Sequence, residues 1–338
     1  MDLAKKVSGA KSLSIEQRIH TKVNHMIAIL SGGVGAARFA AGVTQIMEPS
    51  EVTIISNVGD DEVMHGLHIS PDIDTVIYTL GNAINPETGW GLKDETWRVM
   101  EALGDYGGET WFRLGDKDLA THMFRTHMLA SGKSLTKITE LIRQRWGVEV
   151  NVLPATNDRL RTKLYAEIDG REQELSFQEY FVRHAHEPEI KRIVYENSSS
   201  ALPTREVTRA IETAELIIVA PSNPLLSIAP ILSIAPIAES LKTRRDRIVA
   251  ISPIIAGAAV KGPAAKLMKE LGFMPSALGV AQFYRDFISA IVIDEKDADL
   301  KDQISALNIE VLTTNTLMTD PVVSAQLAQQ VLKLKKVK

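Results

Sequence analysis

The segment 26–75 constrains the fold more than any other part of the chain. Two apolar runs of strand length, 26–30 and 52–56, flank a glycine-containing loop and a helical stretch over 36–46. A strand, a glycine loop, a helix and a second strand, in this order, open a doubly wound α/β sheet. We therefore predict a Rossmann-like, mostly parallel sheet with its functional residues in loops at the carboxyl edge.

The loop after the first strand has the composition of an anion-binding turn. It reads Ser31-Gly32-Gly33-Val34-Gly35, and glycines let the backbone turn tightly and approach a ligand closely. A helix begins here, so its free N–H groups and the positive end of its dipole favour a phosphate. The loop has neither the Lys-Ser/Thr ending of a Walker A motif nor complete G-x-G-x-x-G spacing. A tight turn without a ligand therefore stays open as an alternative.

Four aspartates follow the second strand. Asp60 and Asp61 come directly after it, and Asp72 and Asp74 lie in a Pro-containing segment that we interpret as a loop. Carboxylates beside a phosphate site indicate a hard cation between them, and Mg²⁺ binds carboxylates together with phosphate oxygens and water. The alternative is that these are turn and cap residues, with Asp74 capping a helix that starts at Thr75.

Composition limits the classes of function. Of the 338 residues 45% are apolar and 24% charged, as in globular domains, and a net charge of -4 argues against nucleic-acid binding. The absence of cysteine excludes thiolate catalysis and Cys-based zinc sites, and it fits a cytoplasmic setting. No apolar run approaches the roughly 18 residues that span a bilayer, so we expect no membrane segment.

The pattern along the chain predicts a divided catalytic domain. Residues 1–24 are polar, without the apolar core of a signal peptide, and are expected to form a flexible extension. The Rossmann-like domain comprises 25–150 and 206–332, and a smaller α+β subdomain, 151–205, is inserted between them. Within the insertion we predict two strands, 161–168 and 173–180, that pair around a hairpin turn at Asp169-Gly170.

Other polar residues are weaker candidates for the site. Ser222 and Asn223 follow an apolar strand at the edge where open α/β sheets bind ligands. Arg113 precedes the acidic start of a helix at Asp116, where a surface ion pair is the alternative. Lys266 could reach a phosphate, and a solvated lysine is the alternative. His122 and His127 lie five residues apart, so they do not share a helix face cleanly and we do not predict a zinc pair.

Seven short motifs occur in order along almost the whole chain. They are Ser31-Gly-Gly-Val-Gly, Asn57-Val-Gly-Asp-Asp, Ser70-Pro-Asp-Ile-Asp-Thr, Leu114-Gly-Asp-Lys-Asp-Leu-Ala-Thr-His, Pro221-Ser-Asn-Pro, Ser252-Pro-Ile-Ile and Leu317-Met-Thr-Asp. As an ordered set they resemble the 2-phospho-L-lactate transferase family, called CofD in archaea and FbiA in actinobacteria. The first two motifs resemble the bacterial branch.

The resemblance implies a magnesium-dependent transfer in the biosynthesis of coenzyme F420. Family members join the deazaflavin Fo (7,8-didemethyl-8-hydroxy-5-deazariboflavin) to a guanylyl-activated three-carbon phosphoacid and release GMP. The bacterial donor is enolpyruvoyl-diphospho-guanosine (EPPG) and the product dehydro-F420-0, whereas archaeal members use the lactyl donor (LPPG). A homodimer is typical of the family.

The resemblance also implies roles for the candidate residues of this chain. The donor diphosphate is expected against the glycine loop and Mg²⁺ on Asp60, Asp61 and Asp74. Asp74 is expected to position or deprotonate the attacking hydroxyl, and Ser222 and Asn223 to contact the guanosine side. The catalytic candidates are Asp74, Asp61 and Arg113; the metal ligands are Asp60, Asp61 and Asp74; the substrate-binding candidates are Ser31, Gly32, Gly33, Gly35, Asn57, Asp74, Arg113, Asp116, Ser222, Asn223 and Lys266.

Two other functions remain open at the level of sequence. YvcK-like regulators have a similar glycine loop and bind nucleotide sugars without transforming them, although they lack the Leu-Gly-Asp-Lys-Asp stretch. An NAD-dependent dehydrogenase would need an acidic residue at the end of the second strand to bind ribose, and Ser56-Asn57 stands there.

Overall fold

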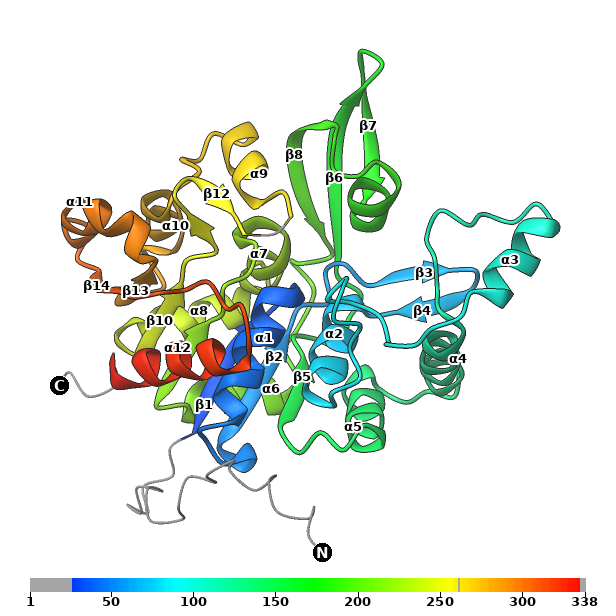
Figure 1. Cartoon of the computed structure of the whole chain (residues 1–338), viewed down its shortest axis with the longest axis horizontal. Coiled ribbons are helices and arrows are strands. Elements are labelled where there is room, and N and C mark those ends of the chain that lie inside the picture. The colour runs from blue at the N-terminus through cyan, green and yellow to red at the C-terminus, as the bar shows by residue number, and fades with distance from the viewer. Residues whose placement is uncertain (1–25, 261, 335–338) are drawn as a thin grey trace, which may run out of the picture.

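A seven-stranded sheet, with every neighbouring pair parallel, forms the centre of the molecule (Figure 1). The computed structural model describes residues 26–260 and 262–334, so the predicted extension 1–24 lies outside the described residues. In spatial order the strands are β5 (Asn151–Pro154), β2 (Val52–Ser56), β1 (Ile27–Ser31), β9 (Leu216–Val219), β10 (Ile248–Ile251), β13 (Ala290–Ile293) and β14 (Glu310–Thr313).

This strand order confirms the doubly wound fold. The chain leaves β1 toward β2 and β5 on one side, then returns to build β9, β10, β13 and β14 on the other. The order therefore reverses between β1 and β9. In open α/β sheets ligands bind in the crevice outside the carboxyl ends of the strands at such a switch point. The residues that follow β1 and β9 thus lie where a site is expected.

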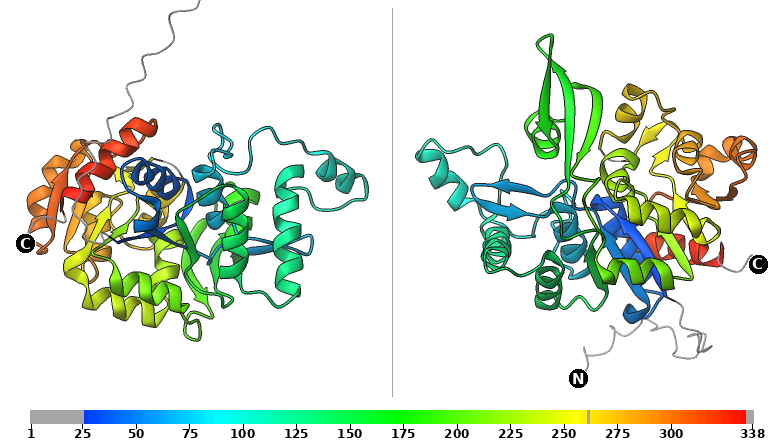
Figure 2. Two further views of the ribbon diagram at one scale, coloured as in Figure 1. Left: turned by 90° about the horizontal axis from the view of Figure 1, so that it is seen from below. Right: turned by 180° about the vertical axis from the view of Figure 1, so that it is seen from behind.

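Helices cover both faces of the sheet because right-handed crossovers place the helices of the two halves on opposite faces. On one face α1 packs between α2 and α12, and on the other α6 packs against α8 (Figure 2). The helix bounds are α1 (Gly33–Thr44), α2 (Pro71–Leu80), α5 (Leu135–Arg145), α6 (Arg205–Thr213), α7 (Ala229–Leu232), α8 (Ala235–Thr243), α9 (Ala264–Glu270), α10 (Ala277–Tyr284), α11 (Lys301–Ser305) and α12 (Pro321–Lys333).

A separate antiparallel sheet stands beside the main one (Figure 1). It has the order β7 (Arg171–Ser176), β6 (Arg161–Ile168) and β8 (Glu189–Glu196). Asp169 and Gly170 both have positive φ, which confirms the predicted hairpin turn. The second strand is shorter than the predicted 173–180, because a short π-helical segment, Glu179–Arg183, follows it. Strand β5 comprises the first four residues of the predicted insertion, 151–154, but it pairs with β2 in the main sheet. The inserted sheet therefore begins after β5.

A second extension, here called the hairpin lobe, projects beside α2 (Figure 1). It consists of β3 (Glu62–Met64), β4 (Leu67–Ile69), α3 (Arg98–Asp105) and α4 (Asp116–Ala130). Ile69, Met100, Leu114 and Leu119 form a small hydrophobic cluster of its own, separate from the main core. Met128 and Leu129 of α4 pack against the main core, so the lobe joins the rest of the protein through the end of this helix.

Helix α2 begins four residues before the predicted start at Thr75. Pro71 occupies its first position, where a missing N–H costs nothing, and Asp72 and Asp74 lie in its first turn, where the helix dipole favours negative charge. The interpretation of 70–74 as a loop was therefore wrong. Both aspartates are carried by a helix.

No single helix among the described residues is long and apolar enough to cross a membrane. One pair, Pro224–Leu232 with Ala235–Thr243, meets the length and composition criteria only when taken together, and it is bent by 90°.

The contact between α1 and β9 generates a stability prediction. A Cβ on Gly35 would lie 2.3 Å from the carbonyl oxygen of Pro221, so Gly35→Ala should force α1 away from the sheet and lower the free energy of unfolding by about 1–3 kcal/mol. The matched control is Gly104→Ala in α3, whose Cβ would meet nothing nearer than 3.5 Å and should leave stability equal or raised. Urea denaturation measures both. Equal effects of the two substitutions would contradict this packing.

Candidate active site

The crevice between β1 and β9 brings two predicted segments together. The backbone N–H of Gly32, just after β1, donates to the hydroxyl of Ser222, just after β9, at 3.4 Å. Asn223 accepts from the N–H groups of Leu225 and Leu226 and so caps the helical turn that follows. Ser31, Gly32 and Ser222 therefore lie together at the switch point, with Asn223 beside them.

The glycines of the loop are needed for contacts within the protein. A Cβ on Gly32 would lie 2.4 Å from Cβ of Ser227, and Gly35 is in the close contact with Pro221 described above. Gly33 has φ +71° and begins α1, with its N–H donating to Oδ1 of Asp72 at 2.6 Å. A negatively charged oxygen thus already lies on one amide at the N-terminus of α1, which is the chemistry expected of a phosphate-binding turn.

Asn57 joins the acidic residues on two elements. Its Nδ2 donates to Oδ2 of Asp72 at 3.0 Å and to Oδ1 of Asp60 at 3.2 Å, while its Oδ1 accepts from the N–H of Gly59 at 2.7 Å. One amide therefore orders the loop after β2 and the first turn of α2. The sequence indicates Asp72 as one of four aspartates beside a cation, but the predicted ligands and catalytic residues do not include it.

Burial is the largest cause of a raised pKa at all four carboxyl groups, which we call the acid cluster: Asp60, Asp61, Asp72 and Asp74. It raises the pKa of Asp72 to about 6. The pKa of Asp60 rises further because the negative charges of Asp72 and Asp61 are close. The positive charge of Arg125 partly offsets the raised pKa of Asp61 and Asp74, and a further cation would favour the ionised form of all four acids.

The acid cluster has free ligand atoms that fit a hard cation. Oδ1 of Asp61 and Oδ2 of Asp74 are buried without a hydrogen-bond partner, while Oδ2 of Asp61 accepts from the Ser70 hydroxyl at 2.7 Å. The hydroxyls of Ser31 and Ser56, at the ends of β1 and β2, are also buried and unpartnered. Oxygen donors of this kind suit Mg²⁺, and a buried polar group without a partner costs free energy.

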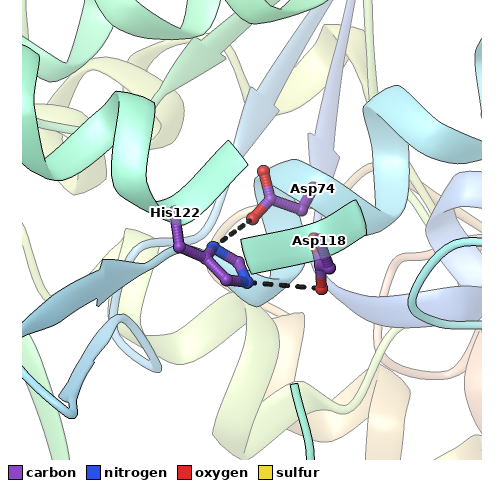
Figure 3. A group of neighbouring side chains, drawn as sticks. All are labelled: Asp74, Asp118 and His122. Atoms are coloured by element: carbon purple, nitrogen blue, oxygen red, sulfur yellow. Dashed lines mark ion pairs between the residues drawn. The ribbon is translucent and has the colours of Figure 1, made fainter. Parts of the chain in front are cut away.

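Two residues of α4, Arg125 and His122, contact Asp74, and neither was predicted from the sequence to belong to the site. Arg125 of α4 is 1% exposed and pairs with Oδ1 of Asp74. His122 lies between Asp74 and Asp118, with Nδ1 3.9 Å from the former and Nε2 3.2 Å from the latter (Figure 3). One ligand atom from each of Asp74, Asp118 and His122 lies within 4.8 Å of the other two, so this group also has the spacing of a cation site.

Three predicted residues make their described contacts outside the acid cluster. Arg113 is exposed and its guanidinium lies 4.4 Å from the ring centre of Trp97. Asp116 accepts from Thr96 and from the N–H groups of Arg98 and Val99 at the start of α3. Lys266 donates to the carbonyl of Pro188 at 2.7 Å and pairs with Glu270 at 2.7 Å.

Comparison with known proteins adds evidence of ancestry. The sequence model of the family described as "2-phospho-L-lactate transferase CofD" matches residues 27–326. A 2-phospho-L-lactate transferase of Methanocaldococcus jannaschii is 38% identical over 87% of this chain and 93% of its own length. A phosphoenolpyruvate transferase of Streptomyces griseus is 39% identical over 91% of this chain and 98% of its own length.

Solved structures support the same architecture. The protein BH3568 of Bacillus halodurans, described as a member of the UPF0052 family, aligns with a TM-score of 0.59 and 16% identity over 91% of this chain and 99% of that protein. At this identity the likeness concerns the fold alone.

The raised pKa of Asp72 generates a prediction about pH. Because its folded value, about 6, exceeds the usual 3.8, the folded protein binds this proton more tightly, and the stabilisation is lost as pH rises from about 4 to 6. In metal-free buffer the wild-type melting temperature should fall more steeply over this window than that of Asp72→Asn. Thermal unfolding in EDTA measures the difference. Parallel curves for the two proteins would contradict the raised pKa.

Proposed function

The chain belongs to the 2-phospho-L-lactate transferase CofD family, and we propose that it transfers a phosphoenolpyruvyl or 2-phospholactyl group from a guanosine-diphospho donor to Fo. The products are GMP and F420-0 or its dehydro form. The observation that carries this proposal is the acid cluster beside the N-terminus of α1, where Gly33 already binds an anionic oxygen. The archaeal 2-phospho-L-lactate transferase and the Streptomyces phosphoenolpyruvate transferase are almost equally identical to this chain, at 38% and 39%. The experiment below therefore tests both three-carbon acids.

The donor diphosphate is proposed to lie at the first turn of α1. The first N–H groups of a helix have no partner within the helix, and the dipole adds positive potential there. Ser31 ends β1, Asn57 follows β2 and Ser222 comes shortly after β9, so all three lie at the carboxyl edge of the sheet near this turn. Ser222 and Asn223 are assigned to the guanosine side because they follow β9, on the far side of the glycine loop from the acids.

The aspartates are proposed to hold Mg²⁺, with Asp60, Asp61 and Asp74 as predicted ligands and Asp72 added by its contacts. When bound, Mg²⁺ neutralises the charge of the diphosphate oxygens and so favours displacement at phosphorus. Oδ1 of Asp61 and Oδ2 of Asp74 make no hydrogen bond, and this role requires oxygens of that kind; Oδ2 of Asp74 lies 3.9 Å from Nδ1 of His122.

The transfer itself needs positioning more than covalent catalysis. The ribityl hydroxyl of Fo forms a bond to the phosphorus that carries the three-carbon acid, the bond from that phosphorus to GMP breaks, and the hydroxyl proton leaves. We assign the orientation of this hydroxyl, and the acceptance of its proton, to Asp74 or Asp61.

Arg113 is proposed to contact Fo from the hairpin lobe, where it is exposed above Trp97. Asp116 and Lys266 are kept as peripheral substrate candidates, each with the protein contacts given above. A homodimer and a cytoplasmic location, the oligomeric state and setting expected from the sequence, remain predictions.

Product analysis tests the proposed reaction. Purified protein with Fo, Mg²⁺ and either EPPG or LPPG should yield GMP and the corresponding Fo adduct in equal amounts, identified by mass. EDTA should abolish both. Binding of UDP-sugars without affinity for Fo would contradict transfer and favour a regulator.

Asp61→Asn should lower the rate of transfer without lowering the stability of the fold. Loss of one metal-binding oxygen should lower kcat by about a hundredfold or more, because charge at the diphosphate is no longer neutralised. Burial raises the pKa of Asp61 well above its usual value, so removing this charge should raise the melting temperature of the metal-free protein. The control is Asp302→Asn on the exposed side of α11, expected to change neither quantity. Full turnover in Asp61→Asn would refute the assignment.

A further inference from the structure

A closed ring of side chains connects α2 to α4. Asp74 and Tyr78 lie one turn apart on α2, and Asp118, His122 and Arg125 lie along α4. Arg125 pairs with Asp74 and its Nη1 lies 3.1 Å from Nδ1 of His122. Nε2 of His122 lies 3.2 Å from Asp118, whose other oxygen accepts from the Tyr78 hydroxyl at 2.6 Å. The ring therefore begins and ends on α2.

Arg125 is the member with the most contacts in this ring. Its guanidinium meets Asp74 of α2, the carbonyl oxygen of His68 in β4 at 3.3 Å, and His122 of its own helix. A guanidinium can only donate, so Nδ1 of His122 is an acceptor and the ring proton is on Nε2, toward Asp118. Three acceptors on three elements fix the plane of the guanidinium, and with it the carboxylate of Asp74.

Stability does not explain why this charged group is buried. Arg125 and His122 are each 1% exposed, and Asp74 is 4% exposed. Apolar side chains of similar volume at a buried ion pair are often as stable or more stable, because the desolvation of both ions is avoided. What apolar residues cannot do is hold one carboxylate oxygen while leaving the other without a hydrogen bond, as Oδ2 of Asp74 is here, 3.9 Å from Nδ1 of His122.

We propose that Arg125 and His122 are positioning residues for the divalent cation: Arg125 fixes Asp74 through Oδ1, and His122 orients Arg125, so that Oδ2, which makes no hydrogen bond, stays available as a ligand. The inference rests on the proposed magnesium-dependent transfer and assigns two further residues to it. It also gives the hairpin lobe a role, because α4 and β4 of the lobe supply the groups that hold Asp74.

Two substitutions of His122 test its contact with Arg125 separately from its contact with Asp118. The side-chain oxygen of Asn can take the place of Nδ1 and accept from Arg125, whereas Gln reaches the position of Nε2 and leaves Arg125 without this acceptor. His122→Gln should therefore weaken metal binding about ten- to hundredfold, as is typical when a group that orients a ligand is lost, and His122→Asn should weaken it clearly less. Arg125→Lys keeps the charge but not the fork of donors, and should resemble His122→Gln.

The affinity for Mn²⁺ alone, measured by electron paramagnetic resonance of the free ion, is the readout, with kcat and KM for Fo measured in parallel. The proposal predicts that kcat falls together with Mn²⁺ affinity while KM for Fo changes little. The matched control is Arg143→Lys in α5, where the guanidinium donates to the carbonyl of Val148 at 2.9 Å and where Mn²⁺ affinity should not change.

The outcomes separate this inference from the proposed function. If the wild type binds Mn²⁺ and forms the Fo adduct, but His122→Gln and Arg125→Lys bind Mn²⁺ equally well, the positioning role is wrong and the transfer stands. A lowered melting temperature with unchanged Mn²⁺ affinity would likewise show a purely structural role. If the wild type binds no Mn²⁺, both the magnesium assignment and this inference fail.

Discussion

A set of buried carboxyl groups at the carboxyl edge of the sheet is the constraint on which the site depends. Four carboxyl groups lie at the ends of β2 and the start of α2, and burial makes each of them harder to ionise. Asn57 and Arg125 satisfy some of their oxygens, and two remain without a partner. Such an arrangement is unfavourable for the fold alone and favourable for a protein that binds a divalent cation beside an anion.

Much of the fold could be predicted from the sequence because its signals are local. The apolar runs of β1 and β2 are continuous, as strands buried on both faces require, and the glycine loop and Asp60-Asp61 directly follow them. The same local reasoning failed at the start of α2. Asp72 and Asp74 behind a proline look like turn residues, yet Pro71 and the two acids are equally typical of a first helical turn.

The support of the site could not be predicted in this way, because its partners are distant in sequence. Arg125 meets Asp74 across 51 positions, within a helix whose pattern gives no sign of a buried arginine. The spacing of His122 and His127 argues against a zinc pair, but it gives no sign of the contacts that His122 makes with Arg125 and Asp118. Asp116 and Lys266 were predicted from charge alone, and the structure shows protein partners that charge does not reveal.

The proposed site requires that a divalent cation binds between the carboxylates at this edge of the sheet. An anomalous difference map from a crystal soaked in Mn²⁺ and GDP tests it most directly. The account predicts one strong peak within ligand distance of Asp61 and Asp74, with the diphosphate at the N-terminus of α1. A peak elsewhere, with the nucleotide far from the glycine loop, would contradict it.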